Sequence, residues 1–300
     1  MTANLFQLGT GIYDLKKPSE KRRWYAYLAR SFLHYPGANA LYRWFLSDPQ
    51  RREIIERYPF LIEQAERKFF FAGASFRQRC ELIRAHVATM LEKFRPEVAR
   101  DLCCATGRYP LWRSPDEGVA WTVQLLHSAG NRKEGLLTLG MFYGETTLYQ
   151  MMVWLGPDRR GEPSLFIGAM QGPNEEDSLG LIRETTKRAH AYRTKNLILY
   201  ITMAFARALG AQRLYAVSFK GYYAYARRDH KLQTDLDAFW QEAGGRLTPD
   251  PRFYELPLVS PRKSIEEVPS KKRAAYRRRF ALLDDADAQV AAGAAALFKR

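Results

Sequence analysis

Apolar residues recur at every third or fourth position through residues 19–100, a spacing that predicts helices rather than strands. In residues 76–94 the apolar side chains would share one helical face, and Pro96 ends the pattern. The sequence Ser47-Asp48-Pro49 is a typical helix start, since proline is well tolerated at the first helical position. We therefore expect residues 1–108 to form a helical N-terminal part.

The pattern changes after Pro110, where apolar or alternating runs replace the helical spacing. The four runs cover residues 121–126, 136–142, 146–155 and 165–170. The segments between them are rich in Gly, Pro, Asn and Asp, which turns favour. Linkers this short connect antiparallel neighbours. The sequence therefore predicts a meander of four antiparallel strands.

A unit of helices and a strand follows the meander. Residues 177–191 and 197–209 are compatible with helices, and residues 213–219 form the next apolar run. Because that run is reached from the fourth strand through a helix, we expect a crossover to a parallel strand.

The end of this region completes the sheet. Residues 236–243 predict another helix, and the segments at 246–247 and 253–258 can supply a hairpin or an edge strand. We expect an α+β fold in three segments: the helical part, a mixed sheet over residues 109–260, and a basic helical extension over residues 261–300.

The chain of 300 residues is 46% hydrophobic, enough for one large core or two modest ones. Its net charge of +15 favours an acidic partner such as nucleic acid, anionic lipid or a phosphate-rich cofactor, although it could serve solubility alone. Basic residues gather in the extension at Arg262, Lys263, Lys271, Lys272, Arg273, Arg277, Arg278 and Arg279. This segment could bind nucleic acid or an anionic membrane, or form a solvated helix packed through its apolar side chains.

The cysteines and histidines do not form a recognisable metal site. Cys80, Cys103 and Cys104 lack the spacing of a zinc site or a disulfide framework, so we interpret them as buried apolar residues of a reducing compartment. The sequence also lacks a secretory signal pattern and a long apolar run. We expect a cytoplasmic protein, with peripheral binding at the inner membrane as an option. No cofactor can be assigned.

The turn at residues 193–196 is a candidate anion site. Arg193, Thr194, Lys195 and Asn196 open a long helix, where unpaired backbone N–H groups and the helix dipole favour phosphate. Arg193 and Lys195 would add positive charge. The alternative is an ordinary helix start with Thr194 or Asn196 as its cap.

Several side chains could transfer protons. Tyr222, Tyr223 and His230 follow the strand predicted at 213–219, at the edge of the sheet where such strands often present a site. Glu145 and His127 lie near predicted sheet turns. Aromatic packing in the core is the alternative for each tyrosine.

Five blocks of sequence resemble the VirK/YbjX family of Gram-negative bacteria. They are IGAMQGP at 167–173, YRTKNL at 192–197, ALGAQRLYAVS at 208–218, DAFWQEAGG at 237–245 and SKKRAAYRRRFALLD at 270–284. The resemblance covers roughly residues 20–290. It implies an association with virulence, the cell envelope and tolerance of antimicrobial peptides, without a defined reaction.

The predicted order of strands and helices is similar to that of GNAT-type acyltransferases. In that family a Gly-rich turn after the fourth strand holds the pyrophosphate of coenzyme A, and a tyrosine after the fifth strand is a general acid. Residues 193–196 match the turn in position and charge but lack its glycines, and Tyr222, Tyr223 and Tyr225 are candidates for the tyrosine. The missing glycines matter for coenzyme A, because a side chain at their position blocks close approach of the backbone to a phosphate.

The resemblances lead to two hypotheses. The first is an acyl or aminoacyl transferase that acts on an amine or hydroxyl, with aminoacyl-tRNA, an acyl-carrier protein or acyl-CoA as the donor. The second is a non-catalytic envelope-stress factor that binds anionic lipid or a protein partner through its basic surface. Both agree with the positive charge of the chain.

Overall fold

The computed structural model describes residues 5–116, 118, 120–173, 178–225 and 235–299. The N-terminal part is helical, as expected. Its helices are α1 (Leu5–Ile12), α2 (Pro18–Leu33), α3 (Tyr35–Leu46), α4 (Pro49–Arg57), α5 (Phe60–Glu66), α6 (Phe76–Lys93) and α7 (Pro96–Cys103).

Local capping explains where two of these helices start. The Asp48 side chain accepts a hydrogen bond from the Arg51 N–H at 3.0 Å, with Pro49 in the first turn. Ser75 and Gln78 form a reciprocal capping box at the start of α6, which satisfies two otherwise unpaired backbone N–H groups. The predicted start at residues 47–49 is therefore confirmed.

The sheet has eight strands in the order β1-β2-β3-β4-β5-β6-β8-β7. They are β1 (Arg108–Arg113), β2 (Trp121–Leu126), β3 (Leu137–Tyr143), β4 (Thr146–Pro157), β5 (Pro163–Gln171), β6 (Arg213–Val217), β7 (Arg246–Leu247) and β8 (Phe253–Leu256). A short 3-10 helix, η1 (Ala129–Asn131), precedes β3. Strands β2 to β5 form the predicted antiparallel meander, and β6 pairs with β5 in parallel. The α+β fold class is confirmed.

Strand β1 was not predicted, because its sequence RYPLWR contains a proline and has charged ends. It pairs with β2, and Trp112 within it is buried against the C-terminal helix, α11 (Ser270–Leu297). The Trp112 indole N–H donates to Asp285 Oδ2 at 3.1 Å. Long-range packing, rather than local pattern, therefore makes this segment a strand.

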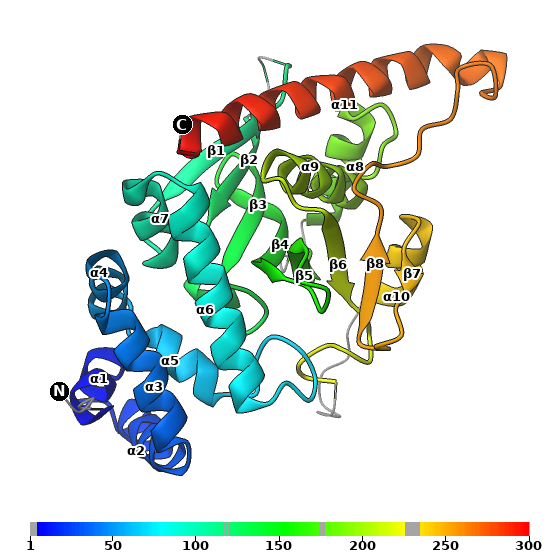
Figure 1. The fold of residues 1–300 in the computed structure, drawn as a ribbon. Coiled ribbons are helices and arrows are strands. Elements are labelled where there is room, and N and C mark those ends of the chain that lie inside the picture. Colours follow the sequence, from blue (N-terminus) through cyan, green and yellow to red (C-terminus); the bar gives the residue numbers. More distant parts are fainter. Residues whose placement is uncertain (1–4, 117, 119, 174–177, 226–234, 300) are drawn as a thin grey trace.

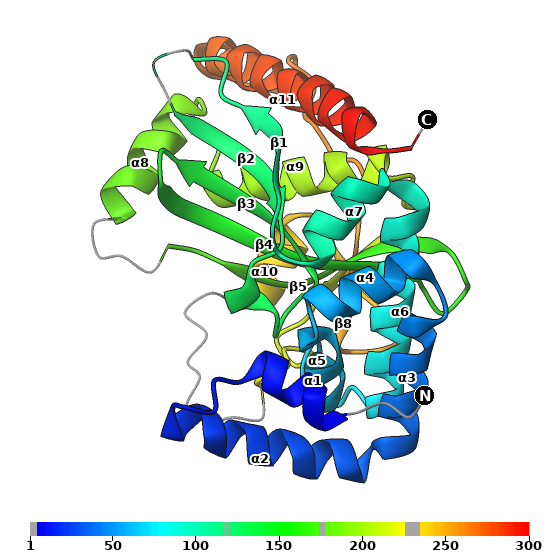
Figure 2. The ribbon, with the colours of Figure 1, turned by 90° about the vertical axis from the view of Figure 1, so that its left-hand side faces the viewer.

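The crossover from β5 to β6 passes through α8 (Ser178–Arg188) and α9 (Thr194–Ala208), and α10 (Leu236–Glu242) follows β6. Eleven of the 15 residues of α9 are buried, because the sheet lies on one side of it and α11 on the other. Figures 1 and 2 show α11 crossing over α9 and β1, while α1 to α5 gather at the far end of the molecule. One continuous cluster of buried residues runs from α3 through the sheet to α11. Whether residues 1–108, 109–260 and 261–300 fold as separate units stays a prediction.

Strands β5 and β6 separate after Ile167 and Ala216, the last parallel pair. Gly168 is an extra residue in β5, since Ile167 is opposite Val153 and Ala169 is opposite Met152 on β4. Such a bulge bends the strand away from its partner. A Cβ atom on Gly168 would lie 1.7 Å from the Glu134 carbonyl oxygen, so the segment before β3 crosses β5 at this glycine.

The basic extension is mostly the helix α11. Its C-terminal half is anchored by Leu283, Ala286 and Val290, whereas Lys271, Lys272, Arg277 and Arg278 near its start are exposed. Within the described residues, none of the helices combines the length and the apolar character that crossing a bilayer requires.

Candidate functional site

A buried carboxyl group lies at the edge of the sheet where β5 and β6 separate. Glu134 is only 3% exposed, and its Oε1 accepts a hydrogen bond from the Tyr222 hydroxyl at 2.8 Å. The Gln171 amide, at the end of β5, lies 3.4 Å and 3.3 Å from the two carboxylate oxygens. These three residues come from the β2–β3 connection, from the end of β5 and from the segment after β6.

A tight turn after β6 holds Tyr222 in place. The Ser218 hydroxyl donates to the Pro251 carbonyl at 2.7 Å and accepts from the Gly221 N–H at 3.0 Å. A Cβ atom on Gly221 would lie 2.1 Å from the Arg252 carbonyl oxygen, so only glycine allows the two backbones to touch here. The Gly221 carbonyl accepts from the Ala72 N–H at 2.7 Å. The turn that carries Tyr222 is therefore held by the segment at residues 251–252 on one side and by Ala72 on the other.

The Glu134 carboxyl is set apart by its electrostatic environment. Burial raises its pKa, while hydrogen bonds from Tyr222 and Gln171 and the charge of Lys133 act in the opposite direction. Burial and the adjacent carboxylate also raise the pKa of Tyr222. A buried carboxyl group with a raised pKa that accepts a hydrogen bond from a phenol is a candidate general acid–base site.

The other proton-transfer candidates lie in different surroundings. Tyr223 is half-buried, with its ring 4.9 Å from that of Tyr222 and 6.0 Å from that of Phe69. Glu145 is exposed in the turn between β3 and β4. His127 is buried beside Tyr58, and burial lowers its pKa to about 4, which keeps the imidazole neutral. His230 lies outside the described residues.

The predicted donor turn opens α9. Arg193 forms a salt bridge to Glu242 at 2.7 Å, and the Lys195 ammonium lies 4.7 Å from the centroid of the Phe239 ring. Thr194 is buried, and its hydroxyl lies 2.9 Å from that of Thr185. The side chains of Arg193, Lys195 and Thr194 therefore already have partners within the protein.

A small cavity of about 170 Å³ adjoins the same turn. It is lined by α9, by α10 and by the chain at Ser260, and both Arg193 and Asn196 reach it. Asn196 Oδ1 is buried and has no hydrogen-bond partner in the described structure. Since α9 leads back to the start of β6, its first turn lies at the edge where β5 and β6 end. Neither Tyr222 nor Glu145 lines this cavity, so the predicted donor and proton-transfer residues do not share it.

Sequence reasoning did not identify Glu134. It lies in the segment SAGNRKEG, which has the composition of a surface turn, and nothing in its spacing separates it from an exposed acid. The interpretation of the three cysteines as buried residues is confirmed. No group of His, Cys, Asp and Glu within the described ranges is arranged to hold a metal ion.

Comparison with known proteins gives a family but no activity. The chain matches the family described as "Protein of unknown function (DUF535)" over residues 16–292. It is 29% identical over 257 residues to the uncharacterized protein YbjX of Escherichia coli K12, which covers 84% of this chain and 76% of the relative. No solved structure matches the chain.

The alignments with two further relatives cover less of this chain. An uncharacterized protein of Haemophilus influenzae is 31% identical over 176 residues, 57% of this chain and 51% of the relative. A protein of Mannheimia haemolytica named membrane protein LapB is 24% identical over 218 residues, 68% of this chain and 88% of the relative. The expected resemblance to the VirK/YbjX family is confirmed by the family match and by the similarity to YbjX.

Proposed function

The chain belongs to the DUF535 family, and we propose that it is an acyl or aminoacyl transferase with a GNAT-like core that acts on an amine or hydroxyl acceptor. The observation that carries the proposal is the buried Glu134–Tyr222 pair, which lies where β5 and β6 separate. The antiparallel meander and the parallel crossover support it at the level of topology.

The pair would handle the protons of the transfer. The Glu134 carboxylate takes the proton of the acceptor N–H or O–H, and the acceptor lone pair attacks the acyl carbonyl carbon. As the bond from this carbon to the donor oxygen or sulfur breaks, the Tyr222 hydroxyl gives its proton to that leaving atom. Glu134 then returns a proton to the phenolate. A raised carboxyl pKa suits this role, because a base is most effective when its pKa is near the working pH.

The surroundings of α9 favour a macromolecular donor over free coenzyme A. The start of α9 lacks glycine, Thr194 is buried there, and the Glu134 backbone fills the gap beside Gly168. We therefore expect a pyrophosphate and its pantetheine arm to fit poorly at the start of α9. Aminoacyl-tRNA and acyl-carrier protein are both acidic, and the net charge of +15 would attract either.

A transfer assay tests the proposal. Radiolabelled aminoacyl-tRNA, acyl-carrier protein and acyl-CoA are each incubated with the full chain and a panel of amines and glycerolipids. We expect transfer from at least one donor, and Tyr222→Phe should reduce its rate by about 10²–10⁴-fold without a matching loss of thermal stability. Tyr225→Phe is the matched control, because Tyr225 is 48% exposed three residues away. Full activity of Tyr222→Phe, or transfer from none of the donors, would refute the proposal.

The exposed start of α11 supports a second candidate function, binding to an anionic membrane surface from the cytoplasmic side. Lys271, Lys272, Arg277 and Arg278 are exposed there, and each basic residue near such a surface contributes roughly 1 kcal/mol. Arg279 is different, since it donates to the His190 carbonyl at 2.9 Å and holds the helix to the body. One relative, LapB, is named a membrane protein.

Vesicle sedimentation tests this second function. The full chain should bind vesicles rich in phosphatidylglycerol and lose binding as the salt concentration rises. Changing Lys271, Lys272, Arg277 and Arg278 to Gln should abolish binding. The matched control changes four exposed arginines outside α11 to Gln and should still bind; these are Arg22, Arg43, Arg77 and Arg246. Unchanged binding by the α11 variant would exclude this helix.

A further inference from the structure

A groove of about 500 Å³ lies between α6 and the sheet, in a different place from Glu134 and Tyr222. Its floor consists of Trp154, Phe166 and Tyr215 on neighbouring strands β4, β5 and β6. The Trp154 and Phe166 rings are parallel within 2° at 5.3 Å, and the Phe166 and Tyr215 rings are within 20° at 5.1 Å. Because the rings stack face to face, they leave mainly their edges for a ligand.

The wall opposite the floor is one side of α6. Gln78, Leu82 and Ala85 line the groove at spacings of four and three residues, which places them in a row along the helix. Seven residues of helix span about 10 Å. Phe71 and Phe253 close one end, with ring centroids 5.2 Å apart, and the turn between β4 and β5 borders the other. An elongated apolar trough of this kind suits an extended hydrocarbon chain.

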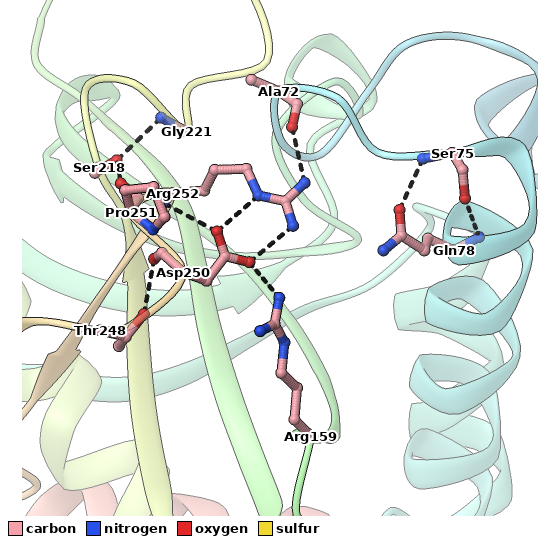
Figure 3. Close-up of polar contacts among 10 residues, drawn as sticks. All are labelled: Ala72, Ser75, Gln78, Arg159, Ser218, Gly221, Thr248, Asp250, Pro251 and Arg252. Atoms are coloured by element: carbon pink, nitrogen blue, oxygen red, sulfur yellow. Dashed lines mark hydrogen bonds and ion pairs between the residues drawn. The ribbon is translucent and has the colours of Figure 1, made fainter.

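A clamp of two arginines on one carboxylate stands at the rim (Figure 3). Arg252 donates to Asp250 through Nε at 2.9 Å and through Nη2 at 2.7 Å, and Arg159 reaches the same carboxylate at 2.5 Å. Figure 3 shows the capping residues Ser75 and Gln78 of α6 across from these arginines. Asp250 is 10% exposed, whereas the Arg159 side chain is 76% exposed and keeps donors free for another anion.

The remaining acids of the rim already have partners. Asp158 accepts from the Arg160 N–H at 2.7 Å and from the Tyr215 hydroxyl at 2.9 Å. Glu81 and Glu255 pair with arginines outside the groove, at 2.8 Å and 2.7 Å. Arg160 is exposed, and its backbone N–H makes the hydrogen bond to Asp158. With Glu81 and Glu255 paired outside the groove, Arg159, Arg160 and Arg252 carry one positive charge more than Asp158 and Asp250.

We propose that this groove binds a single-chain amphiphile, with its acyl chain lying along the aromatic floor and its anionic head at Arg159 and Arg160. The head is a carboxylate or a phosphate, because both present oxygens that arginine can bind in a bidentate manner. The volume is within the usual range for small-molecule sites, which are mostly apolar with a few placed polar groups. Binding here does not require that the protein be a transferase.

A fluorescent probe tests the proposal with the full chain. Dansyl-undecanoate should show a saturable increase in emission, and laurate and lauroyl lysophosphatidate should displace it. Displacement by only one of them identifies the head group as carboxylate or phosphate. Dodecanol has the chain without the charge and should compete at least about tenfold more weakly, a difference of about 1.4 kcal/mol. Absence of saturable binding, or equal competition by dodecanol, would overturn the proposal.

Two variants of α6 locate the site. Ala85→Trp should fill the groove and weaken probe binding at least about tenfold. Ala88→Trp is the matched control, since Ala88 is exposed on the same helix, and it should bind normally. Equal binding by both variants would contradict the proposed place.

Quenching by brominated laurate gives an independent measurement in case Ala85→Trp does not fold. Trp154 lines the groove, so Trp154→Phe should remove most of the quenching by the bound acid and retain probe binding. Arg160→Gln should weaken laurate binding and leave dodecanol competition unchanged. Quenching that persists in Trp154→Phe would place the acid elsewhere.

Discussion

Two carboxylates near the end of β6 differ in how their charge is balanced. Asp250 contacts two arginines, and the hydrogen bonds from Arg252 hold its pKa below the usual range. Glu134 is bonded only to a phenol and an amide in the structure described above, and burial raises its pKa. A paired carboxylate stabilises a fold, whereas a buried carboxyl without a paired cation destabilises its own charged form. The contrast separates the rim of the groove from the site that we propose for proton transfer.

Among these carboxyl groups, replacing Glu66 should change the stability of the protein most. Glu66 is 3% exposed on α5, accepts from the Ser31 hydroxyl at 2.5 Å, and has a pKa that burial raises to about 8. Because the folded protein keeps this proton longer than the unfolded chain, the stability that Glu66 contributes is fully present below pH 4.5 and is lost as the pH rises to 8. Glu66→Gln should remove this loss.

Urea denaturation measures the difference. At pH 8 the Gln variant should exceed the wild type in unfolding free energy by on the order of 4 kcal/mol, since each pKa unit corresponds to about 1.4 kcal/mol. The two should be nearly equal at pH 4.5. A constant difference across this range would show that Glu66 does not titrate as described.

Asp250→Asn should have a smaller effect of opposite sign. The change removes the negative charge between Arg252 and Arg159 and leaves two arginines without it, so we expect a loss of about 2 kcal/mol at pH 7. The lowered pKa means that the wild-type advantage is present above about pH 4, the ordinary range of an aspartate, and is lost as the pH falls through the folded-state pKa. Equal stability of variant and wild type at pH 7 would contradict a structural role for this clamp.

Glu134→Gln should give the smallest change in stability, with the same sign as Glu66→Gln and the opposite sign to Asp250→Asn. Because the folded pKa of Glu134 is raised, its ionisation lowers wild-type stability as the pH rises, and the variant should be more stable than the wild type at pH 8. Transfer activity should fall in the same variant. Lower stability of Glu134→Gln at pH 8 would show that the site stabilises the carboxylate, and the distinction from Asp250 would then fail.

Much of the fold could be predicted because it depends on local pattern. The alternating runs of β2 to β5, the apolar helix α9 ending before Gly210 and the start of α4 at Pro49 all follow from side-chain periodicity, turn residues and capping. Strand β1 could not be predicted, since Pro110 weakens its strand character and its pairing depends on β2 and α11.

The candidate site was only partly accessible to the same reasoning. Tyr222 was identified from its position after a strand, whereas Glu134, its partner 88 positions earlier, was hidden in a segment with turn composition. The turn at residues 193–196 was predicted as a donor site from its place at a helix start and from its charge, yet Arg193 faces Glu242 in a salt bridge. Charge can be counted from sequence, but the partner of each charge cannot.

The sequence by itself determined the family, the order of strands and helices and the excess of basic residues, because these depend on residues close together in the chain. The tertiary structure decided which groups meet. It placed Glu134 beside Tyr222, bent β5 at Gly168, and aligned Trp154, Phe166 and Tyr215 under α6. Burial and pairing set the pKa of a carboxyl group, and both arise only when distant segments pack together.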